Sequence, residues 1–285
     1  MDRSACIFSH APSTSDVIEA HGFSARRCSA CGVLYNNRAS AENGPLFTPA
    51  RSGDLYDEMV TKAHFEAFYS VNPNYHSIGE EPTTLLEIAC GQGQLLKIAK
   101  KAGLQTFGVE LNREAAEELE KKHGIPCESK VFSAATFGDR KFDVIFHREL
   151  IGRLRDPVQQ LCEMKDKLNP HGQLIFETGN YADVSTARYK YLARWADPEA
   201  LHYYGESSIR ELLKMAGFTR IQIISWSLRP ELLLSPVLGG IRKVTKGRGI
   251  AARSRARFKY FLRYTIGALS SDRSIPRTML VWAMK

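Results

Sequence analysis

Two glycines interrupt an apolar stretch in "LLEIACGQGQLL", residues 85–96. Gly91 and Gly93 stand between a strand-like segment and a helix-like segment, and glycine lets a backbone approach a ligand closely. A glycine loop in this position is typical of nucleotide binding. A dinucleotide-binding loop has a third glycine, in the pattern G-x-G-x-x-G, but Leu96 occupies that position here. The loop therefore predicts a nucleotide-containing ligand and argues against a dinucleotide.

Two acidic residues accompany the glycine loop. Glu110 ends the next strand-like segment, 17 residues after Gly93, and a carboxylate there can accept hydrogen bonds from both hydroxyls of a ribose. Glu87 precedes Gly91 by four residues. A negatively charged wall suits a positively charged ligand better than a pyrophosphate. The alternative is that the two glycines only form a tight turn.

Cysteines near the N-terminus have metal-ligand spacing. Cys28 and Cys31 form C-x-x-C followed by glycine, which is half of a zinc-ribbon knuckle. Cys6 and His10 lie upstream and complete a candidate Cys3His site, with His21 as a rival fourth ligand. The alternatives are a degenerate knuckle without metal and a redox C-x-x-C. The redox alternative is disfavoured because no thioredoxin-like strand precedes the motif.

The middle of the chain alternates strand and helix patterns. Strands are predicted at 83–89, 104–110, 126–132, 142–147, 172–178 and 219–227, with a last one at 278–285. Helices are predicted at 94–103, 112–124, 157–168 and 207–218. This alternation predicts an α/β fold with a doubly wound, parallel sheet, whose ligands bind at the carboxyl ends of the strands.

Three segments resemble class I S-adenosylmethionine-dependent methyltransferases. "LLEIACGQGQLLKIAKKAGLQTFGVELN" resembles their first motif and following strand, and "KFDVIFHRELIGRLRDPVQQLCEMKDKLNPHGQLIFETGN" resembles their fourth and fifth strand regions. "ALHYYGESSIRELLKMAGF" resembles the last helix of a branch that includes ubiquinone-type and sugar methyltransferases. The likeness covers about residues 55–226, and it is specific for the superfamily but not for a substrate. Many members of this branch also carry two cysteine pairs ahead of the catalytic domain.

The resemblance implies a Rossmann-like methyltransferase sheet and S-adenosylmethionine as cofactor. It places the cofactor on Glu87, Ala89, Gly91, Gly93, Glu110, Leu111, Phe132, Ser133 and His147. The family often has an acid after the third strand that holds the adenine amine. Here Ser133 or Glu128 must replace it, while Phe132 packs on the adenine. Gly152 and Arg153 stand where the branch often has a Glu-His pair, which removes one candidate general base.

Methyl transfer is an in-line displacement that depends mainly on holding the nucleophile and the methyl group in line. A base is needed only if the acceptor must lose a proton. His147, at the end of the fourth strand, and His202 are the candidate bases, although each can equally be a packing or hydrogen-bonding residue. The candidate acceptor-binding residues are Glu149, Arg153, Tyr181, Tyr203 and Tyr204.

The chain is predicted to have four parts. Residues 1–50 form a small zinc-ribbon-like module, residues 54–226 form the cofactor-binding core with a leading helix, and residues 276–285 form the last strand. Residues 227–275 form a basic helical insert, with nine Lys and Arg between 242 and 263. We expect this insert to be a lid or an acceptor-binding subdomain, with possible peripheral contact to a membrane surface or a polyanion through residues 242–263. The alternative is an ordinary amphipathic helix docked on the domain.

Composition narrows the class of protein. The 285 residues are 44% hydrophobic, as in a globular chain, and no apolar run is long enough for a transmembrane segment. The start, "MDRSACIFSH", lacks a signal-peptide core, so a cytoplasmic protein is expected. The expected function is methylation of oxygen or carbon on a small molecule, such as a natural product, a sugar or a quinone-like compound. Nucleic-acid methylation is disfavoured because the core lacks an Asn/Asp-Pro-Pro-aromatic motif, and a non-catalytic binding protein on the same fold is the third alternative.

Overall fold

The computed structural model describes residues 6–10, 17–20, 23–37, 83–181, 197, 199–226 and 277–285. The predicted leading helix, the basic insert and the rival ligand His21 lie outside the described residues. The chain divides into two compact units. One comprises Met1–Thr48, Lys130–Ser225 and Arg273–Lys285, and the other comprises Pro49–Ser129 and Trp226–Asp272.

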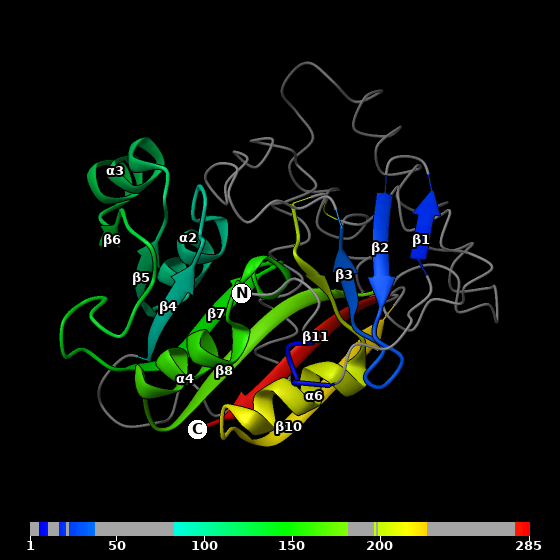
Figure 1. Cartoon of the computed structure of the whole chain (residues 1–285). Coiled ribbons are helices and arrows are strands. Elements are labelled where there is room, and N and C mark those ends of the chain that lie inside the picture. The colour runs from blue at the N-terminus through cyan, green and yellow to red at the C-terminus, as the bar shows by residue number, and fades with distance from the viewer. Residues whose placement is uncertain are drawn as a thin grey trace, which may run out of the picture. The chain divides into compact units, whose positions relative to one another are not determined.

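The unit that contains the glycine loop is built from parallel strands joined by helices (Figure 1). Its elements are β4 (Thr84–Ile88), α2 (Gln94–Lys101), β5 (Gln105–Val109), α3 (Arg113–His123) and β6 (Cys127–Glu128). The strands pair in the order β4-β5-β6, all parallel. Helix α2 packs against β4 and β5, and α3 packs against β6. The strand predicted over 126–132 has only two residues, because polar "ESK" follows Cys127 and offers nothing apolar to bury.

Local signals set the limits of helix α3. The side chain of Asn112 accepts a hydrogen bond from the backbone N–H of Ala115, at 3.0 Å, and so caps the helix N-terminus. Gly124 ends the helix with a left-handed backbone, at φ 59°. Both ends agree with the predicted helix over 112–124.

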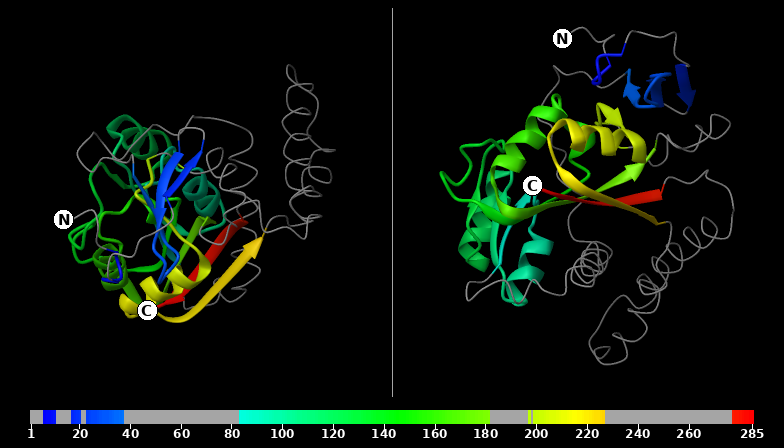
Figure 2. Two further views of the ribbon diagram at one scale, coloured as in Figure 1. Left: turned by 45° about the vertical axis from the view of Figure 1, so that its right-hand side comes forward. Right: turned by 90° about the horizontal axis from the view of Figure 1, so that it is seen from below.

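The other unit contains a second set of strands and helices. Its elements are β7 (Phe142–Arg148), the short 3-10 helix η2 (Ile151–Arg153), α4 (Pro157–Asp166), β8 (Leu168–Asn180), α6 (Glu206–Met215), β10 (Thr219–Trp226) and β11 (Arg277–Met284). The strands lie in the order β10-β11-β8-β7, with β7 parallel and β11 antiparallel to β8. Helices α4 and α6 contact each other, and α4 packs on β8 (Figures 1 and 2). These elements agree with the predicted strands and helices of this part of the chain.

Helix α6 begins one residue earlier than the predicted serine-capped helix. The hydroxyl of Ser208, in its first turn, accepts from the backbone N–H of Gly205 and donates to its carbonyl, both at 3.0 Å. A serine thus caps the helix from inside its first turn.

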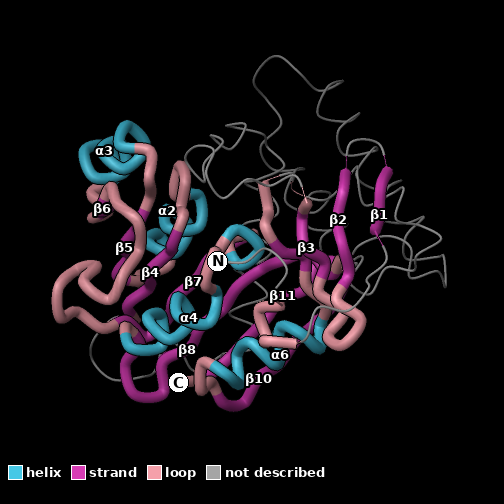
Figure 3. The backbone as a smooth tube through the Cα atoms, in the orientation of Figure 1, coloured by secondary structure: helices cyan, strands magenta, loops and turns pink. Residues whose placement is uncertain are grey.

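A second, smaller sheet belongs to the same unit (Figure 3). It contains β1 (Val17–Ala20), β2 (Phe23–Arg27), β3 (Leu34–Asn36) and β9 (His202–Tyr203), in that order and all antiparallel. Strand β9 comes from the segment "ALHYYGE", far along the chain from the other three. The N-terminal strands and the methyltransferase-like region therefore share one sheet, which the sequence did not predict.

In the described part of the chain, no helix combines the length and apolarity needed to cross a membrane.

The middle strand of the glycine-loop unit is shaped by Gly108. A Cβ atom at this position would lie 2.9 Å from the Cys90 sulfur, 3.0 Å from the Cys127 sulfur and 3.1 Å from Leu96 Cδ1. The two sulfurs approach to 3.9 Å above the glycine. Cys90 and Cys127 lie on either side of β5, and strands are about 4.8 Å apart. Their Cα atoms are therefore too far apart for a disulfide, and the thiols are packing groups.

Replacing Gly108 by alanine should therefore destabilise the protein. We expect Gly108→Ala to lower the free energy of unfolding by about 1–3 kcal/mol, because the sulfurs and Leu96 leave no room for a methyl group. In a background with Cys90→Ala and Cys127→Ala, the cost of the same change should fall below about 1 kcal/mol. Chemical denaturation of the four proteins measures both values. Equal costs in the two backgrounds would contradict the packing explanation.

Candidate functional site

The glycine loop is a tight, outward-facing turn after β4. Ala89, Gly91 and Gly93 all have left-handed backbones, at φ 56°, 53° and 64°. The turn is closed by a 2.8 Å hydrogen bond from the N–H of Gly93 to the carbonyl of Cys90. A Cβ atom at Gly93 would lie 2.5 Å from Leu119 Cδ2, so only glycine fits there. At Gly91, no described atom lies within 4 Å of the same point, which leaves a ligand free to approach the backbone.

Glu110 ties this turn to the end of β5. The residue is only 1% exposed, and its two carboxylate oxygens accept hydrogen bonds from backbone N–H groups. The N–H of Gly91 donates to Oε2 at 2.7 Å, and the N–H of Asn112 donates to Oε1 at 2.9 Å. A buried carboxylate is tolerated when such charge-assisted hydrogen bonds compensate it. Glu110 therefore fixes the turn, and each oxygen keeps a lone pair for a ligand hydroxyl.

The other predicted cofactor residues lie in different surroundings. Glu87 is buried on β4, and Leu111 is 41% exposed beside Glu110. Phe132, Ser133 and His147 belong to the other unit. There Phe132 is buried, and the N–H of Ser133 donates to the Thr136 hydroxyl at 3.0 Å. The structure thus brings together the predicted residues from Glu87 to Leu111.

Cys6, His10, Cys28 and Cys31 form a compact cluster in which all four ligand atoms lie within 4.8 Å of one another. The Cys6 sulfur is 3.5 Å from both the Cys31 sulfur and His10 Nδ1, and the Cys28 sulfur is 3.7 Å from the same nitrogen. Zinc–sulfur distances near 2.3 Å imply edges of about 3.8 Å in a tetrahedral site. The four side chains therefore fit a structural zinc ion. We call these four residues the cysteine cluster.

The knuckle geometry explains the position of Cys28 in the cysteine cluster. The N–H of Gly32 donates to the Cys28 carbonyl at 2.8 Å, with Gly32 at φ 74°. Burial tends to raise the pKa of the Cys28 thiol. Hydrogen bonds with the Cys31 backbone and with His10 outweigh burial and lower this pKa to about 6. Cys28 is therefore the thiol best prepared to bind a cation as thiolate.

The two candidate histidines differ in exposure, because His147 is buried and His202 is half-buried. His147 is completely buried and stacks on Phe176, with ring centroids 4.6 Å apart. Neither of its ring nitrogens has a hydrogen-bond partner among the described residues, and burial lowers its pKa to about 3. Burial also lowers the pKa of His202 to about 4, against a backbone hydrogen bond at Leu154. Both rings are therefore neutral at neutral pH, and both are weak proton acceptors.

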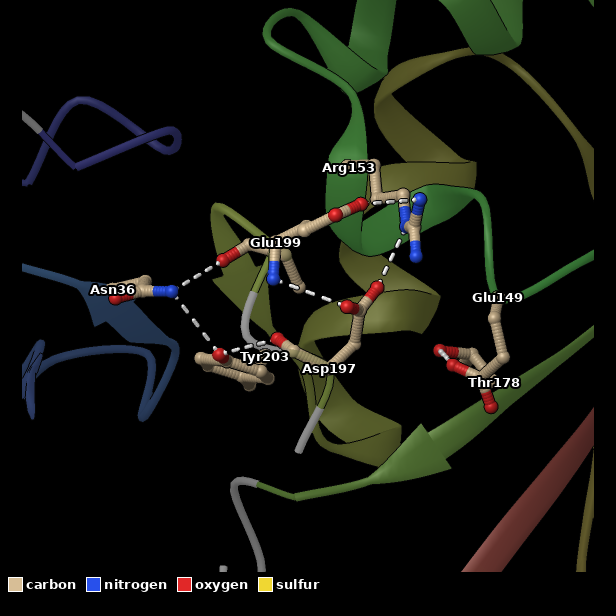
Figure 4. A network of polar contacts seen from close by, with 8 residues as sticks. Asn36, Glu149, Arg153, Thr178, Asp197, Glu199 and Tyr203 are labelled. Carbon is tan, nitrogen blue, oxygen red and sulfur yellow. Dashed lines mark hydrogen bonds and ion pairs between the residues drawn. The ribbon is translucent and has the colours of Figure 1, made fainter. Parts of the chain in front are cut away.

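Glu149 is the first residue after β7, at the strand end where ligands of parallel sheets bind. Its backbone is left-handed, at φ 51°, and its N–H donates to the Glu177 carbonyl at 2.8 Å. Its carboxyl group lies 3.5 Å from the Thr178 hydroxyl (Figure 4). Burial of the carboxyl raises the pKa of Glu149 to about 8, with further contributions from Glu177 and Asp197. A non-glycine residue in this conformation at a strand end is a functional-site candidate.

Gly152 and Arg153 hold the segment that leads into β9. A Cβ atom at Gly152 would lie 2.8 Å from the His202 carbonyl oxygen, so the Glu of the usual Glu-His pair could not fit here. Arg153 forms ion pairs with Asp197, at 2.6 Å, and with Glu199, at 2.9 Å (Figure 4). Gly152, in place of the usual Glu, therefore makes room for this segment. Arg153, in place of the usual His, anchors it through the two ion pairs.

The three candidate tyrosines lie in β9 or directly beside it. The N–H of Tyr181 donates to the Tyr204 carbonyl at 2.9 Å, and the Tyr181 and Tyr203 rings meet edge to face at 5.5 Å. The Tyr203 hydroxyl donates to the Asp197 carbonyl at 2.8 Å. Tyr204 is fully buried, and its hydroxyl has no hydrogen-bond partner within the described ranges.

Sequence reasoning missed two residues that join β9 to the N-terminal strands, Tyr35 and Asn36. The apolar stretch "VLY" directly after the knuckle could have indicated a strand, but nothing in the sequence names β9 as its partner.

Comparison with known proteins identifies the family. The sequence model of a family described as "Methyltransferase domain" matches residues 63–223, which leaves the cysteine cluster outside the match. Ubiquinone biosynthesis O-methyltransferases from Methylococcus capsulatus and Cereibacter sphaeroides are each 25% identical to the chain, over 126 and 171 residues. These alignments include 40% and 55% of this chain and 53% and 66% of the relatives, so the chain spans between about half and two thirds of their length.

Solved structures show the same fold. A SAM-dependent methyltransferase from Archaeoglobus fulgidus superposes with a TM-score of 0.51 at 16% identity, covering 81% of this chain and all of that one. Phosphoethanolamine N-methyltransferase 2 from Haemonchus contortus, in complex with S-adenosyl-L-methionine, superposes with a TM-score of 0.52 at 16% identity, covering 78% and 52%. The α/β prediction is therefore confirmed as a Rossmann-like methyltransferase fold. The chain belongs to the methyltransferase-domain family of class I S-adenosylmethionine-dependent enzymes.

Proposed function

We propose that this protein transfers the methyl group of S-adenosylmethionine to an oxygen of a small molecule, with a phenol or a quinone-like compound as the favoured acceptor. The observation that carries this proposal is the glycine turn bound to the buried carboxylate of Glu110, inside the region matched by the methyltransferase family. The names of the curated relatives support an oxygen acceptor. A cytoplasmic location and a role for residues 242–263 stay predictions.

The cofactor is proposed to lie along the turn after β4, beside the end of β5. The open approach to Gly91 suits the amino-acid part of the cofactor, and Glu110 would accept the ribose hydroxyls. The acidic residues Glu87 and Glu110 beside the turn suit a sulfonium ligand better than a pyrophosphate. Phe132, Ser133 and His147 stay predicted contacts of the cofactor.

Glu149 is proposed to take the proton that the acceptor hydroxyl loses. As the carbon–sulfur bond breaks and the new carbon–oxygen bond forms, the hydroxyl proton passes to the carboxylate and the sulfonium becomes a neutral thioether. A base works best when its pKa lies near the working pH. Glu149 meets this condition better than His147 or His202, whose pKa values burial lowers far below neutrality. Arg153 is proposed to anchor the β9 segment, because two acids already pair with it.

The cysteine cluster is proposed to hold one structural zinc ion. Three thiolates and one imidazole are a common ligand set for zinc, and the closed cluster leaves no position for a reacting group. The metal would stabilise the N-terminal strands and take no part in methyl transfer.

Changing Glu110 should weaken cofactor binding. We expect Glu110→Ala to reduce the affinity for S-adenosylhomocysteine at least about tenfold, because charge-assisted hydrogen bonds to the ribose are lost. Calorimetric titration measures this, with Glu114→Ala as a control at an exposed acid on α3. Glu110→Gln, which keeps the shape of the side chain, separates the charge from the fold. Unchanged affinity in both Glu110 variants, or binding of NAD in place of S-adenosylmethionine, would reject the cofactor assignment.

The raised pKa of Glu149 makes both stability and turnover depend on pH. The folded carboxyl holds its proton up to about pH 8, whereas the unfolded one loses it near 4.5. Its contribution to stability is therefore complete below pH 4.5 and is lost as the pH rises to about 8. Glu149→Gln cannot ionise, so we expect it to gain stability relative to the parent protein across this range.

Methylation of a dihydroxybenzoate probe should rise with pH towards 8 in the parent protein and fall at least about tenfold in Glu149→Gln. Glu211→Gln, at an exposed position on α6, serves as the matched control. A variant with the parent's pH–rate profile would show that Glu149 is not the proton acceptor.

A further inference from the structure

Strand β9 is held from two sides, and one of them is the N-terminal strand β3. Leu34 pairs with Tyr203, and Tyr35 pairs with His202. Asn36 extends this pairing, because its N–H donates to the Leu201 carbonyl at 3.0 Å and its side chain donates to the Ala200 carbonyl at 2.9 Å. Figure 4 shows the Asn36 amide pointing at this segment and at the Tyr203 hydroxyl. A segment of the methyltransferase domain thus forms the outer strand of the N-terminal sheet.

The other side of β9 is the methyltransferase fold itself. The N–H of Leu201 donates to the Gly152 carbonyl at 2.8 Å, and the Tyr204 carbonyl accepts from Tyr181 at 2.9 Å. Gly152 follows β7, and Tyr181 follows β8, so both contacts lie at the carboxyl ends of these parallel strands. Any loosening of β9 would therefore move groups at the end of the sheet where Glu149 lies.

Tyr35 connects the cysteine cluster to β9. Its hydroxyl donates to the Cys6 sulfur at 3.0 Å and accepts from the N–H of Ile7 at 2.9 Å. Its ring meets the His202 ring edge to face, with centroids 5.4 Å apart. The residue is only 9% exposed. The Tyr35 side chain therefore makes two contacts. Its hydroxyl binds the sulfur of a candidate metal ligand, and its ring packs on His202 of β9.

Tyr204 packs beside His202 at the end of β9. Its side chain is fully buried, and its hydroxyl has no hydrogen-bond partner among the described residues. The Tyr204 and His202 rings are 6.0 Å apart. Three consecutive residues, His202 to Tyr204, thus lie between the cysteine cluster and the strand ends of the methyltransferase domain.

A bound metal would stabilise this whole arrangement. Three thiols and an imidazole within 4.8 Å need a cation to remain together once the thiols ionise. A thiolate is also a stronger acceptor for the Tyr35 hydroxyl than a thiol. Without the metal, Cys6 and its neighbours lose their main link to the knuckle, and Tyr35 loses its fixed acceptor.

We propose that the cysteine cluster is a positioning device for the methyltransferase domain, in which a bound metal acts through Tyr35 to hold the segment His202–Tyr204, which contains β9, in place. This inference rests on the proposed function, both for the zinc ion and for the role of this end of the sheet in acceptor binding. Tyr35 is a positioning residue, because it acts through His202 and touches no reacting atom. Metal occupancy then controls acceptor binding and leaves cofactor binding at the glycine turn unchanged.

The experiment compares the full-length protein before and after metal removal with 1,10-phenanthroline, with zinc measured by elemental analysis. Hydrogen–deuterium exchange is followed in peptides that cover residues 199–205, 33–37 and 84–93. We expect exchange to rise at least about tenfold in the first two peptides and to stay constant in the third, since local opening follows the lost contacts. Added zinc should reverse the change. Affinity for S-adenosylhomocysteine should stay within about twofold of its original value.

Tyr35→Phe tests the link without disturbing the metal ligands. This variant keeps the ring and all four ligands, so it should bind one zinc per chain. We expect exchange of residues 199–205 to rise about fivefold, the effect of one lost hydrogen bond. Thr219→Val is the matched control, because it removes a hydroxyl that contacts the Met284 carbonyl elsewhere in the same unit.

The outcomes separate the two proposals. Zinc that leaves while residues 199–205 keep their exchange rate would overturn the positioning role but leave the zinc site intact. Protein that neither contains nor binds zinc would reject the zinc site, and the positioning role with it. Parent-like exchange in zinc-loaded Tyr35→Phe would reject Tyr35 as the connection.

Discussion

The buried carboxylate of Glu110 is the interaction on which the glycine-loop unit depends. A charge that is 1% exposed must be compensated, and the backbone N–H groups of Gly91 and Asn112 compensate it. One of these groups belongs to the turn after β4, and the other starts the cap of α3. A single side chain therefore sets the positions of two strand ends and one helix start. The same carboxylate can then serve a ligand without a new arrangement of the backbone, because its partners are already in place.

Glycine has a different physical role at each of three positions around this carboxylate. At Gly93 the Leu119 side chain excludes a Cβ atom, and at Gly108 two cysteine sulfurs and Leu96 exclude it. At Gly91 no described atom lies within 4 Å of a Cβ position, so packing does not exclude a side chain there. Two of these glycines allow close packing inside the unit, and the third keeps its surface accessible. Close packing therefore explains the glycine at two of these positions and leaves the third for the proposed cofactor contact.

The other unit depends on strand β9 and the residues beside it. These pair with β3 on one side and form hydrogen bonds to the segments after β7 and β8 on the other. Gly152 allows the close approach of the His202 carbonyl, and Arg153 forms ion pairs with both acids of the incoming segment. Gly152 and Arg153 occupy the positions of the Glu-His pair of the resembling branch, and here they hold the segment that leads into β9. Because both histidines are neutral and weak proton acceptors, the proton-accepting role is proposed to move to Glu149. Its backbone is left-handed, and burial raises its pKa, with further contributions from Glu177 and Asp197.

The sequence by itself determined the features that depend on neighbours along the chain. The limits of α3, the glycine turn after β4 and the C-x-x-C-G knuckle all follow from local residue types, because caps, turns and knuckles are short-range structures. Glu110 could be named from the sequence as a ligand candidate, because it ends the predicted strand that follows the glycine turn, 17 residues after Gly93. The four metal-ligand candidates could be named from spacing, although only the fold shows that Cys6 and His10 meet Cys28 and Cys31.

Only the tertiary structure decided which distant residues meet. The pairing of β3 with β9 joins residues more than 160 positions apart, and two-residue strands carry no pattern of their own in the sequence. The pKa values of His147, His202 and Glu149 depend on burial and on charges from other elements, so the residue types alone favoured the histidines as bases. Gly152 looked like a missing catalytic residue and proved to be a packing site. In each case the reason is the same: desolvation and close packing arise from the whole fold, whereas the sequence displays only local preference.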